Sequence, residues 1–191
     1  MHKKTRKSFS SQKAFTLIEI ILAVAIMIII IPMIYGTFYL VQVSHARVVV
    51  LNDARDFASL NAMAIDNILA NTSAAIASDS GVGGYAAALY VDSTSGVLFV
   101  QQGSGAAVPA FDYPQYNLAD GKQKWKLDIT FQVNSSSQTV DYVIEVLDNA
   151  KPTGSDPYFT LRSSVYLPNG NRNETELLVS SSGARINFTK P

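Results

Sequence analysis

The feature that most constrains this chain is an uninterrupted apolar segment near its N-terminus. The residues from Ile20 to Val43 include no charged side chain, and a helix of that length spans roughly 36 Å at about 1.5 Å per residue. The hydrocarbon core of a bilayer is about 30 Å thick, so the segment predicts a transmembrane helix. A cleaved secretory signal has a shorter apolar region and a small-residue cleavage site, and this segment has neither. Pro32 and Gly36 lie inside the run and predict a local bend or an unwound turn, which membrane helices tolerate.

Charge is distributed unevenly around this segment. The first 14 residues hold five of the 15 basic residues and none of the 15 acidic residues: Lys3, Lys4, Arg6, Lys7 and Lys13. Basic flanks remain on the cytoplasmic side of a membrane, so we expect the rest of the chain to lie outside the cytoplasm. That remainder is acidic overall, with ten basic against fifteen acidic residues. Nucleic-acid-binding domains are typically basic, so no direct nucleic-acid binding is predicted.

Side chains suited to catalysis are scarce beyond the apolar segment. The chain has no cysteine, which excludes disulfides and thiolate metal sites. Its two histidines, His2 and His45, both flank the apolar segment, which excludes imidazole-based catalysis or metal binding in the outer part. The Gly-rich stretch Gly81 to Gly84 lacks the lysine that a phosphate-binding loop needs. We therefore expect no enzymatic activity, no metal site and no cofactor.

The helix is predicted to continue beyond the membrane as far as Ser78. Apolar residues recur there at three- and four-residue steps, the period of an amphipathic helix: Leu51, Ala54, Ala58, Ile65, Leu69 and Ile76. The sequence Ser78-Asp79-Ser80-Gly81 follows and has the composition of a turn. We expect the apolar face of this helix to be covered by the segment that follows it.

That following segment has the period of β-strands. Apolar residues alternate with polar ones in 125–133 and 140–146, with a turn at 134–138, so these segments predict an antiparallel hairpin. Further strands are expected at 159–167 and 186–188, and a second hairpin at 89–91 and 97–100, with an irregular connection over 103–121. One long helix followed by a run of strands predicts an α+β fold with an antiparallel sheet on the helix.

The chain is accordingly divided into four segments. Residues 1–14 form a basic leader, 15–43 the transmembrane part of the helix, 44–78 its amphipathic part, and 79–191 an extracytoplasmic β-sheet domain.

One loop offers oxygen ligands. Asp148, Asn149, Gly154 and Asp156 resemble a loop that could surround a calcium ion, but their spacing is not that of an EF-hand. The same residue types are also typical of an ordinary turn, which is the interpretation we favour.

A single acidic residue, Glu19, stands at the start of the apolar segment. A carboxylate at the centre of a bilayer costs about 2.5–3.5 kcal/mol on insertion scales. Two interpretations are open. Glu19 lies near enough to the interface to reach water, or it pairs with a positive charge that makes its burial tolerable.

The basic leader, Ala14, and the sequence Phe15-Thr16-Leu17-Ile18-Glu19 before a long apolar helix resemble the class III signal of type IV prepilins and type II secretion pseudopilins. The match covers about 30 residues. The resemblance implies leader cleavage between Ala14 and Phe15 and methylation of the new Phe15 amine. That amine, in the same chain or in a neighbour, becomes the counter-charge of Glu19 during assembly. The family normally has Gly where this chain has Ala14, and Pro32 lies nearer the new N-terminus than in major pilins, as in minor pilins.

The resemblance implies a structural subunit of a type IV pilus, a secretion pseudopilus or a competence-type DNA-uptake filament. The expected partners are other pilin-like subunits, the prepilin peptidase and methyltransferase, the inner-membrane assembly platform and membrane lipid. The chain would be a single-pass protein of the cytoplasmic membrane before assembly, and part of a cell-surface or periplasmic filament afterwards. The alternative is a signal-anchored monomer whose extracytoplasmic β domain binds a ligand or partner.

Overall fold

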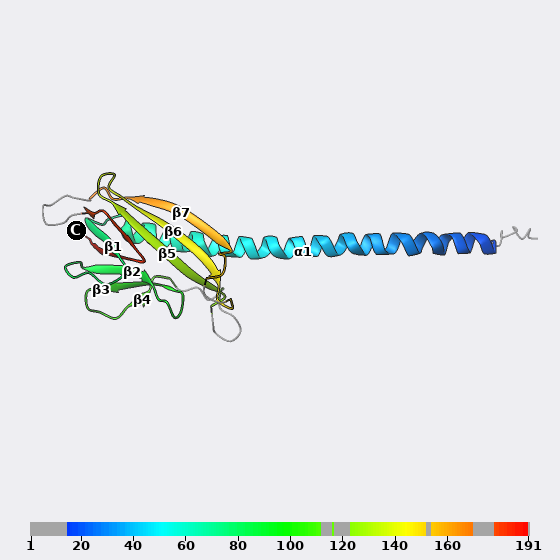
Figure 1. Cartoon of the computed structure of the whole chain (residues 1–191), viewed down its shortest axis with the longest axis horizontal. Helices are drawn as coiled ribbons and strands as arrows, with labels where there is room; N and C mark the ends of the chain where they lie inside the picture. Colours follow the sequence, from blue (N-terminus) through cyan, green and yellow to red (C-terminus); the bar gives the residue numbers. More distant parts are fainter. Residues whose placement is uncertain (1–14, 112–115, 117–122, 152–153, 170–177, 191) are drawn as a thin grey trace, which may run out of the picture. The chain divides into compact units, whose positions relative to one another are not determined.

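The computed structural model describes residues 15–111, 116, 123–151, 154–169 and 178–190. The chain divides into two compact units, residues 1–48 and residues 49–191. In chain order, a single long helix, α1 (Leu17–Leu69), precedes all of the described strands (Figure 1). The predicted α+β fold, with a long N-terminal helix packed against largely antiparallel sheets, is confirmed.

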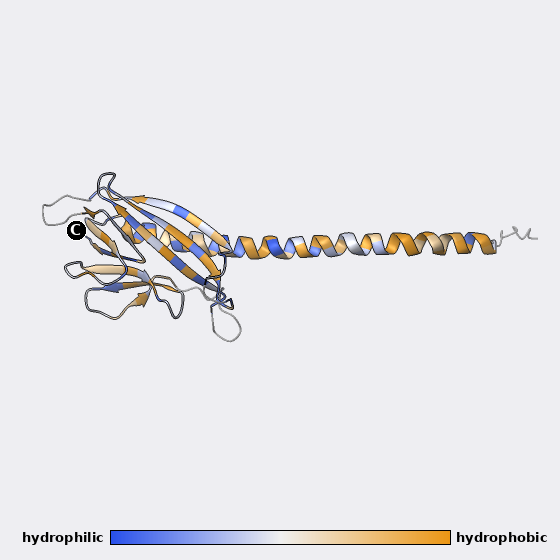
Figure 2. Cartoon of the chain, in the orientation of Figure 1, coloured by the Kyte–Doolittle hydropathy of each residue, from blue (hydrophilic) through white to orange (hydrophobic). Residues whose placement is uncertain are grey.

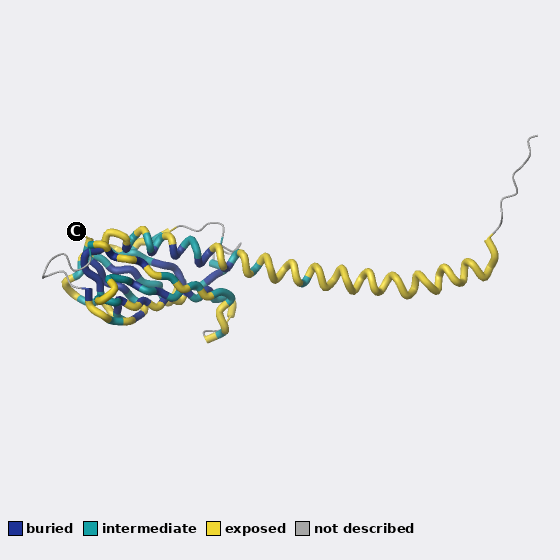
Figure 3. The backbone as a smooth tube through the Cα atoms, turned by 90° about the horizontal axis from the view of Figure 1, so that it is seen from above, coloured by how far each residue is buried: buried dark blue, intermediate teal, exposed yellow. Residues whose placement is uncertain are grey.

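The first unit consists, in its described part, of the apolar portion of α1. Every residue from Phe15 to position 42 is exposed, although most are hydrophobic (Figures 2 and 3). This portion is long and apolar enough to cross a membrane, judged by length and composition. The helix runs on through Pro32 and Gly36, so of the two predicted alternatives the unwound turn is wrong, and the local bend stays a prediction.

In the second unit, the last part of α1 buries one face against the sheets. The residues of this face are fully or almost fully buried: Ala54, Phe57, Ala58, Asn61, Ala62, Ile65 and Leu69. Their three- and four-residue spacing is the helical period predicted from the sequence. Leu51, which was expected on the same face, is 46% exposed and lies outside the core.

The helix ends at Leu69, and its predicted continuation to Ser78 is wrong. Thr72 N donates to Leu69 O, closing a turn. Residues Ala74–Ser78 then form a strand, β1, that pairs antiparallel with β10 (Arg185–Thr189). The alanines and Ile76 in this stretch fit either a helix or a strand, and pairing with a partner more than a hundred residues away decides between them.

Six strands form the first sheet, in the order β4-β3-β2-β10-β1-β8. Figure 1 labels β1 to β4 of this sheet. The members not yet given are β2 (Ala87–Val91), β3 (Leu98–Gln102), β4 (Val108–Pro109) and β8 (Leu178–Val179). All neighbours are antiparallel except β1 and β8, which are parallel. The predicted early hairpin is confirmed as β2 and β3. The expected irregular connection contains β4, and its residues 112–115 and 117–121 lie outside the described part of the chain.

Four strands form the second sheet, in the order β7-β6-β5-β9. They are β5 (Trp125–Asn134), β6 (Thr139–Asp148), β7 (Phe159–Tyr166) and β9 (Ser181–Gly183). The predicted hairpin is confirmed as β5 and β6, with Ile129 opposite Ile144. Along β5, every second residue from Trp125 to Val133 is buried, which is the alternation of a strand with one wet face.

The two sheets share one hydrophobic core with the last part of α1. A polar contact crosses it, because the Tyr142 hydroxyl on β6 donates to Asp66 Oδ1 on α1 at 2.6 Å. The C-terminal segment joins the sheets, since β8 and β10 lie beside β1 while β9 lies beside β5. At β9, a Cβ on Gly183 would collide with the backbone of Ser78, so the close approach of the two sheets requires glycine there.

Candidate functional site

The first turn of α1 carries the acidic residue that the sequence singled out. Thr16 N donates to Glu19 Oε2 at 2.9 Å, and the Thr16 hydroxyl donates to the same oxygen at 3.0 Å. In return, Glu19 N lies 3.4 Å from Thr16 Oγ1. These reciprocal bonds form a capping box, which gives Thr16 N a partner at the open end of the helix, whereas Glu19 N also donates to Thr16 O at 3.1 Å.

The capping box sits at the edge of an apolar surface. Phe15 is 81% exposed and immediately precedes Thr16. An open groove of about 360 Å³ runs along this side of the helix and is lined by Phe15, Glu19, Ile20, Ala23, Val24 and Met27. Ala23 leaves room between bulkier neighbours. The groove therefore offers space for an apolar side chain of another helix beside a carboxylate.

The predicted cleavage site is only half described. Phe15 and Glu19 are placed, whereas Ala14 and the basic leader 1–14 lie outside the described residues. Cleavage, methylation and pairing of Glu19 with a new amine therefore remain predictions. The role of Thr16 was missed by the sequence analysis, although the Thr-x-x-Glu spacing that signals a capping box is visible in the sequence.

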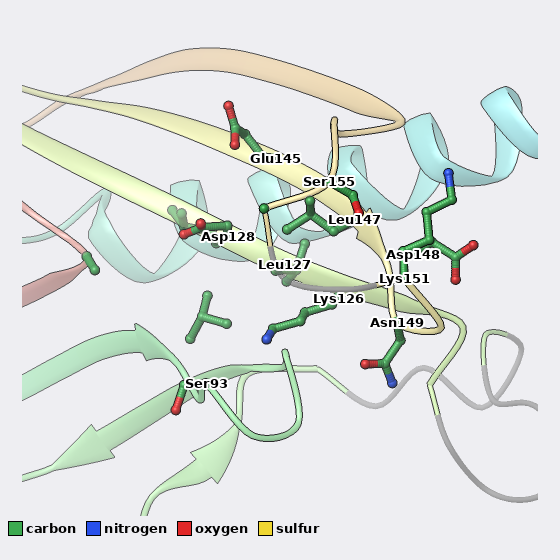
Figure 4. Close-up of a pocket in the computed structure, with 14 residues that line it drawn as sticks. Ser93, Lys126, Leu127, Asp128, Glu145, Leu147, Asp148, Asn149, Lys151 and Ser155 are labelled. Atoms are coloured by element: carbon green, nitrogen blue, oxygen red, sulfur yellow. The ribbon is translucent and has the colours of Figure 1, made fainter.

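A second candidate site lies in the β-rich unit. An open pocket of about 460 Å³ is bounded by β5, β6, the loop after β6 and the turn after β2 (Figure 4). Its charged side chains are of both signs: Lys126, Asp128, Glu145, Asp148 and Lys151. Among the described residues, no two of these form an ion pair within 4 Å. The pocket can therefore offer both cationic and anionic groups to a polar ligand. The sequence analysis pointed only to its loop residues Asp148, Asn149 and Gly154, and not to the residues of β5.

The turn after β2 borders this pocket and holds a further carboxylate. Asp92 Oδ2 accepts hydrogen bonds from Ser95 N at 2.8 Å and from the Ser95 hydroxyl at 2.7 Å. These bonds, followed by the nearby Lys126 ammonium, lower the pKa of Asp92 below its usual value. Asp92 is thus held as an anion within its own turn.

The loop considered for calcium has the bonds of a turn. Asp148 Oδ1 accepts a hydrogen bond from Ala150 N at 2.9 Å, and Asp148 O accepts one from Lys151 N at 3.0 Å. The Lys151 ammonium lies 4.4 Å from the centre of the Tyr158 ring. In the described stretches, no three histidine or acidic side chains are placed to hold a metal ion together. The two hydrogen bonds accepted by Asp148 support the turn interpretation.

No family model, curated protein or solved structure matches this chain.

Proposed function

We propose that this chain is a pilin-like structural subunit, anchored in the cytoplasmic membrane by residues 15–43 and assembled into a filament through its N-terminal helix. The observation that carries the proposal is the isolation of one carboxylate. Glu19 is the sole charged residue between Lys13 and Arg47, and it stands in the first turn of an exposed apolar helix. An acid in that setting is costly unless a cation pairs with it.

The geometry of the first turn is compatible with such pairing. The described bonds of the Glu19 side chain all use Oε2. The other oxygen, Oε1, is left to accept a bond from an ammonium, and a carboxylate accepts several bonds at once. Cleavage before Phe15 would create an ammonium one residue from Thr16. The capping box would then hold the carboxylate in place for the amine of the same chain or of a neighbour.

The exposed apolar surface supports an environment of lipid or other helices. Side chains from Phe15 to Val41 are exposed in isolation, including many isoleucines. Exposing such a surface to water costs roughly 25 cal/mol of free energy per Å² of apolar area. Membrane lipid before assembly, and neighbouring helices afterwards, would each cover it. The groove beside Glu19 gives a neighbouring helix a place where apolar packing and charge pairing coincide.

The first test is the mass of the mature N-terminus. Mass spectrometry of the protein from cells with a working prepilin peptidase should find Phe15 as the first residue, carrying a methyl group. An intact leader beginning at Met1 in those cells would overturn the proposal.

The second test separates charge from capping. We expect Glu19→Ala and Glu19→Gln to insert into the membrane normally but to be depleted from filaments, because neither supplies a negative charge. Thr16→Val removes the hydroxyl bonds of the cap and keeps the charge, so it should retain most of its incorporation. Filament incorporation of Glu19→Ala at the level of the unmodified chain would refute the role of Glu19.

The rival is an anchored monomer whose outer domain binds a ligand, and the mixed-charge pocket beside β5 is the observation that favours it. For that protein, Glu19→Ala would leave function unchanged, whereas Lys126→Ala and Asp128→Ala would abolish ligand binding. The same Glu19 experiment therefore discriminates between the two functions.

A further inference from the structure

One face of the six-stranded sheet carries a row of cationic and aromatic side chains. Arg185 is opposite Tyr90, Tyr90 is opposite Phe99, and Phe99 is opposite Pro109, across β10, β2, β3 and β4. Their neighbours along the strands, Ile186, Leu89 and Leu98, are fully buried in the core. Because successive side chains of a strand point to opposite faces, the row lies on the outer face. We call these four residues the Arg185 row.

The guanidinium in this row is fixed in position. Arg185 Cζ lies 4.4 Å from the centre of the Tyr90 ring, and the Tyr90 and Phe99 rings are stacked with centroids 6.4 Å apart. Arg185 Nη2 donates to Gln101 Oε1 at 2.9 Å, and Arg185 Nε donates to Asn187 Oδ1 at 3.2 Å. Asn187 is itself only 2% exposed, so one of the two groups that orient the guanidinium is rigidly held.

This cation lacks a counter-charge in the described part of the chain. No carboxylate there lies within 4 Å of Arg185. A guanidinium has five N–H donors, and the two bonds above leave three for another acceptor. Arginine and tyrosine held in fixed positions are also the residues that dominate the energy of protein interfaces.

The second sheet presents a pair of carboxylates at the mixed-charge pocket, which Lys126 and Lys151 also line. Asp128 on β5 is directly opposite Glu145 on β6, and Asp128 is exposed. No cation of the described residues lies within 4 Å of either carboxylate. Two like charges directly opposite each other destabilise a strand pair, so an external cation would relieve this repulsion. An arginine suits the position because its planar fork bonds to carboxylates through two N–H groups.

We propose that the Arg185 row of one copy docks on Asp128 and Glu145 of a second copy of this chain. The contact joins two different patches, so it is heterologous and can repeat from copy to copy, as a filament requires. It deepens the proposed function and rests on it, because the N-terminal helices bring the copies together and this contact sets which sides of the β-rich units meet.

The absence of cysteine in the chain makes cross-linking a clean test. Pro109→Cys places one thiol in the Arg185 row, and Thr130→Cys places one beside Asp128 on the outer side of β5; both positions are exposed. The full-length variants are expressed in the membrane separately and together, and treated with a short bismaleimide. We expect dimers only where both variants are present. Dimers that form equally well from either variant alone would overturn the heterologous contact.

Charge reversal provides the second arm. We expect Arg185→Glu, and separately Asp128→Lys with Glu145→Lys, to lower the cross-linked fraction by about tenfold or more, because each places like charges in contact. A chain carrying all three substitutions should recover cross-linking, which also shows that the reversed residues do not prevent folding. The matched control is Arg55→Glu, an exposed arginine on α1 outside both patches, which should leave the fraction unchanged.

The outcomes separate the two proposals. Cross-linking that is insensitive to Arg185→Glu, or not recovered in the triple variant, overturns the contact. If the leader is cut before Phe15 and Glu19-dependent incorporation is normal while no mixed dimer forms, the contact is wrong and the proposed function stands. If the leader remains uncut and no mixed dimer forms, both are wrong.

Discussion

The substitution Tyr142→Phe tests the polar contact that crosses the core. The Tyr142 hydroxyl donates to Asp66 Oδ1 at 2.6 Å and lies 3.4 Å from Ala62 O, and Tyr142 is 1% exposed. The substitution removes these bonds and leaves the ring in contact with Phe131, whose centroid is 6.4 Å away. A change in stability would therefore report the hydroxyl and not the packing.

The expected loss of stability depends on the charge and the exposure of Asp66, the partner of the Tyr142 hydroxyl. A hydrogen bond to a charged group contributes about 1.5–3 kcal/mol net. Asp66 is half-buried, so water can replace part of the lost bond. We expect Tyr142→Phe to lower the free energy of unfolding by about 1.5–2 kcal/mol at neutral pH, near the lower end of that range.

The same hydroxyl predicts a pH dependence of defined sign. Burial, followed by the hydrogen bond to Asp66, raises the pKa of Tyr142 above its ordinary value. Above pH about 10 the unfolded chain loses this proton while the folded chain keeps it, so stability falls with rising pH by about 1.4 kcal/mol per unit. Below that pH the contribution is constant. The difference in stability between the unmodified chain and Tyr142→Phe should thus narrow above pH 10.

Urea unfolding of the full chain in detergent micelles measures both effects. The fluorescence of Trp125 reports the transition, because it is the single tryptophan and is buried in the same core. Tyr166→Phe is the matched control, since that residue is 61% exposed and its hydroxyl lies 3.3 Å from Gln138 Oε1. It should change stability by less than about 0.5 kcal/mol. Equal stability of Tyr142→Phe and the unmodified chain at pH 7, or a difference that does not narrow above pH 10, would refute the reasoning.

Three further substitutions test other contacts. Thr16→Val should cost about 1 kcal/mol of helix stability and speed hydrogen exchange at the first turn of α1, because both bonds of the Thr16 hydroxyl are lost; unchanged exchange would contradict this. Gly183→Ala should destabilise the β-rich unit by about 1–3 kcal/mol in urea unfolding, because its Cβ would meet the Ser78 backbone; an unaffected transition would show that the sheets can separate there. Asp53→Asn breaks the 2.8 Å ion pair with Lys124, and both side chains are partly exposed, so it should cost less than about 1 kcal/mol and less still in high salt. A larger loss would mean that the pair is better shielded than its exposure indicates.

Local periodicity predicted the elements whose neighbours lie close in sequence. The alternation in Trp125–Asn134 and Thr139–Asp148 identified the hairpin because both strands are long and half-buried. The helix was recognised because its core positions keep the helical period up to Leu69. Its end was misplaced because Ala74–Ser78 has no strong preference of its own, and its pairing with β10 depends on residues at the other end of the chain.

The short strands could not be read from the sequence. Val108–Pro109, Leu178–Val179 and Ser181–Gly183 are too brief for a period to show, and each exists through its partner. The division into two sheets was not predicted either. The short strands β8 and β9 are neighbours in sequence but belong to different sheets. In the candidate site, Glu19 was predicted from the sequence because of its charge. The Arg185 row was not predicted, because it depends on pairings between distant strands.

The dual attachment of residues 178–189 has a consequence for biogenesis. These residues follow every other described strand in the chain, yet β10 occupies the interior of one sheet between β1 and β2, and β9 completes the edge of the other. Neither sheet can therefore close before the chain has been synthesised as far as β10. A product that stops before β10 has unpaired strands, which a protease can recognise.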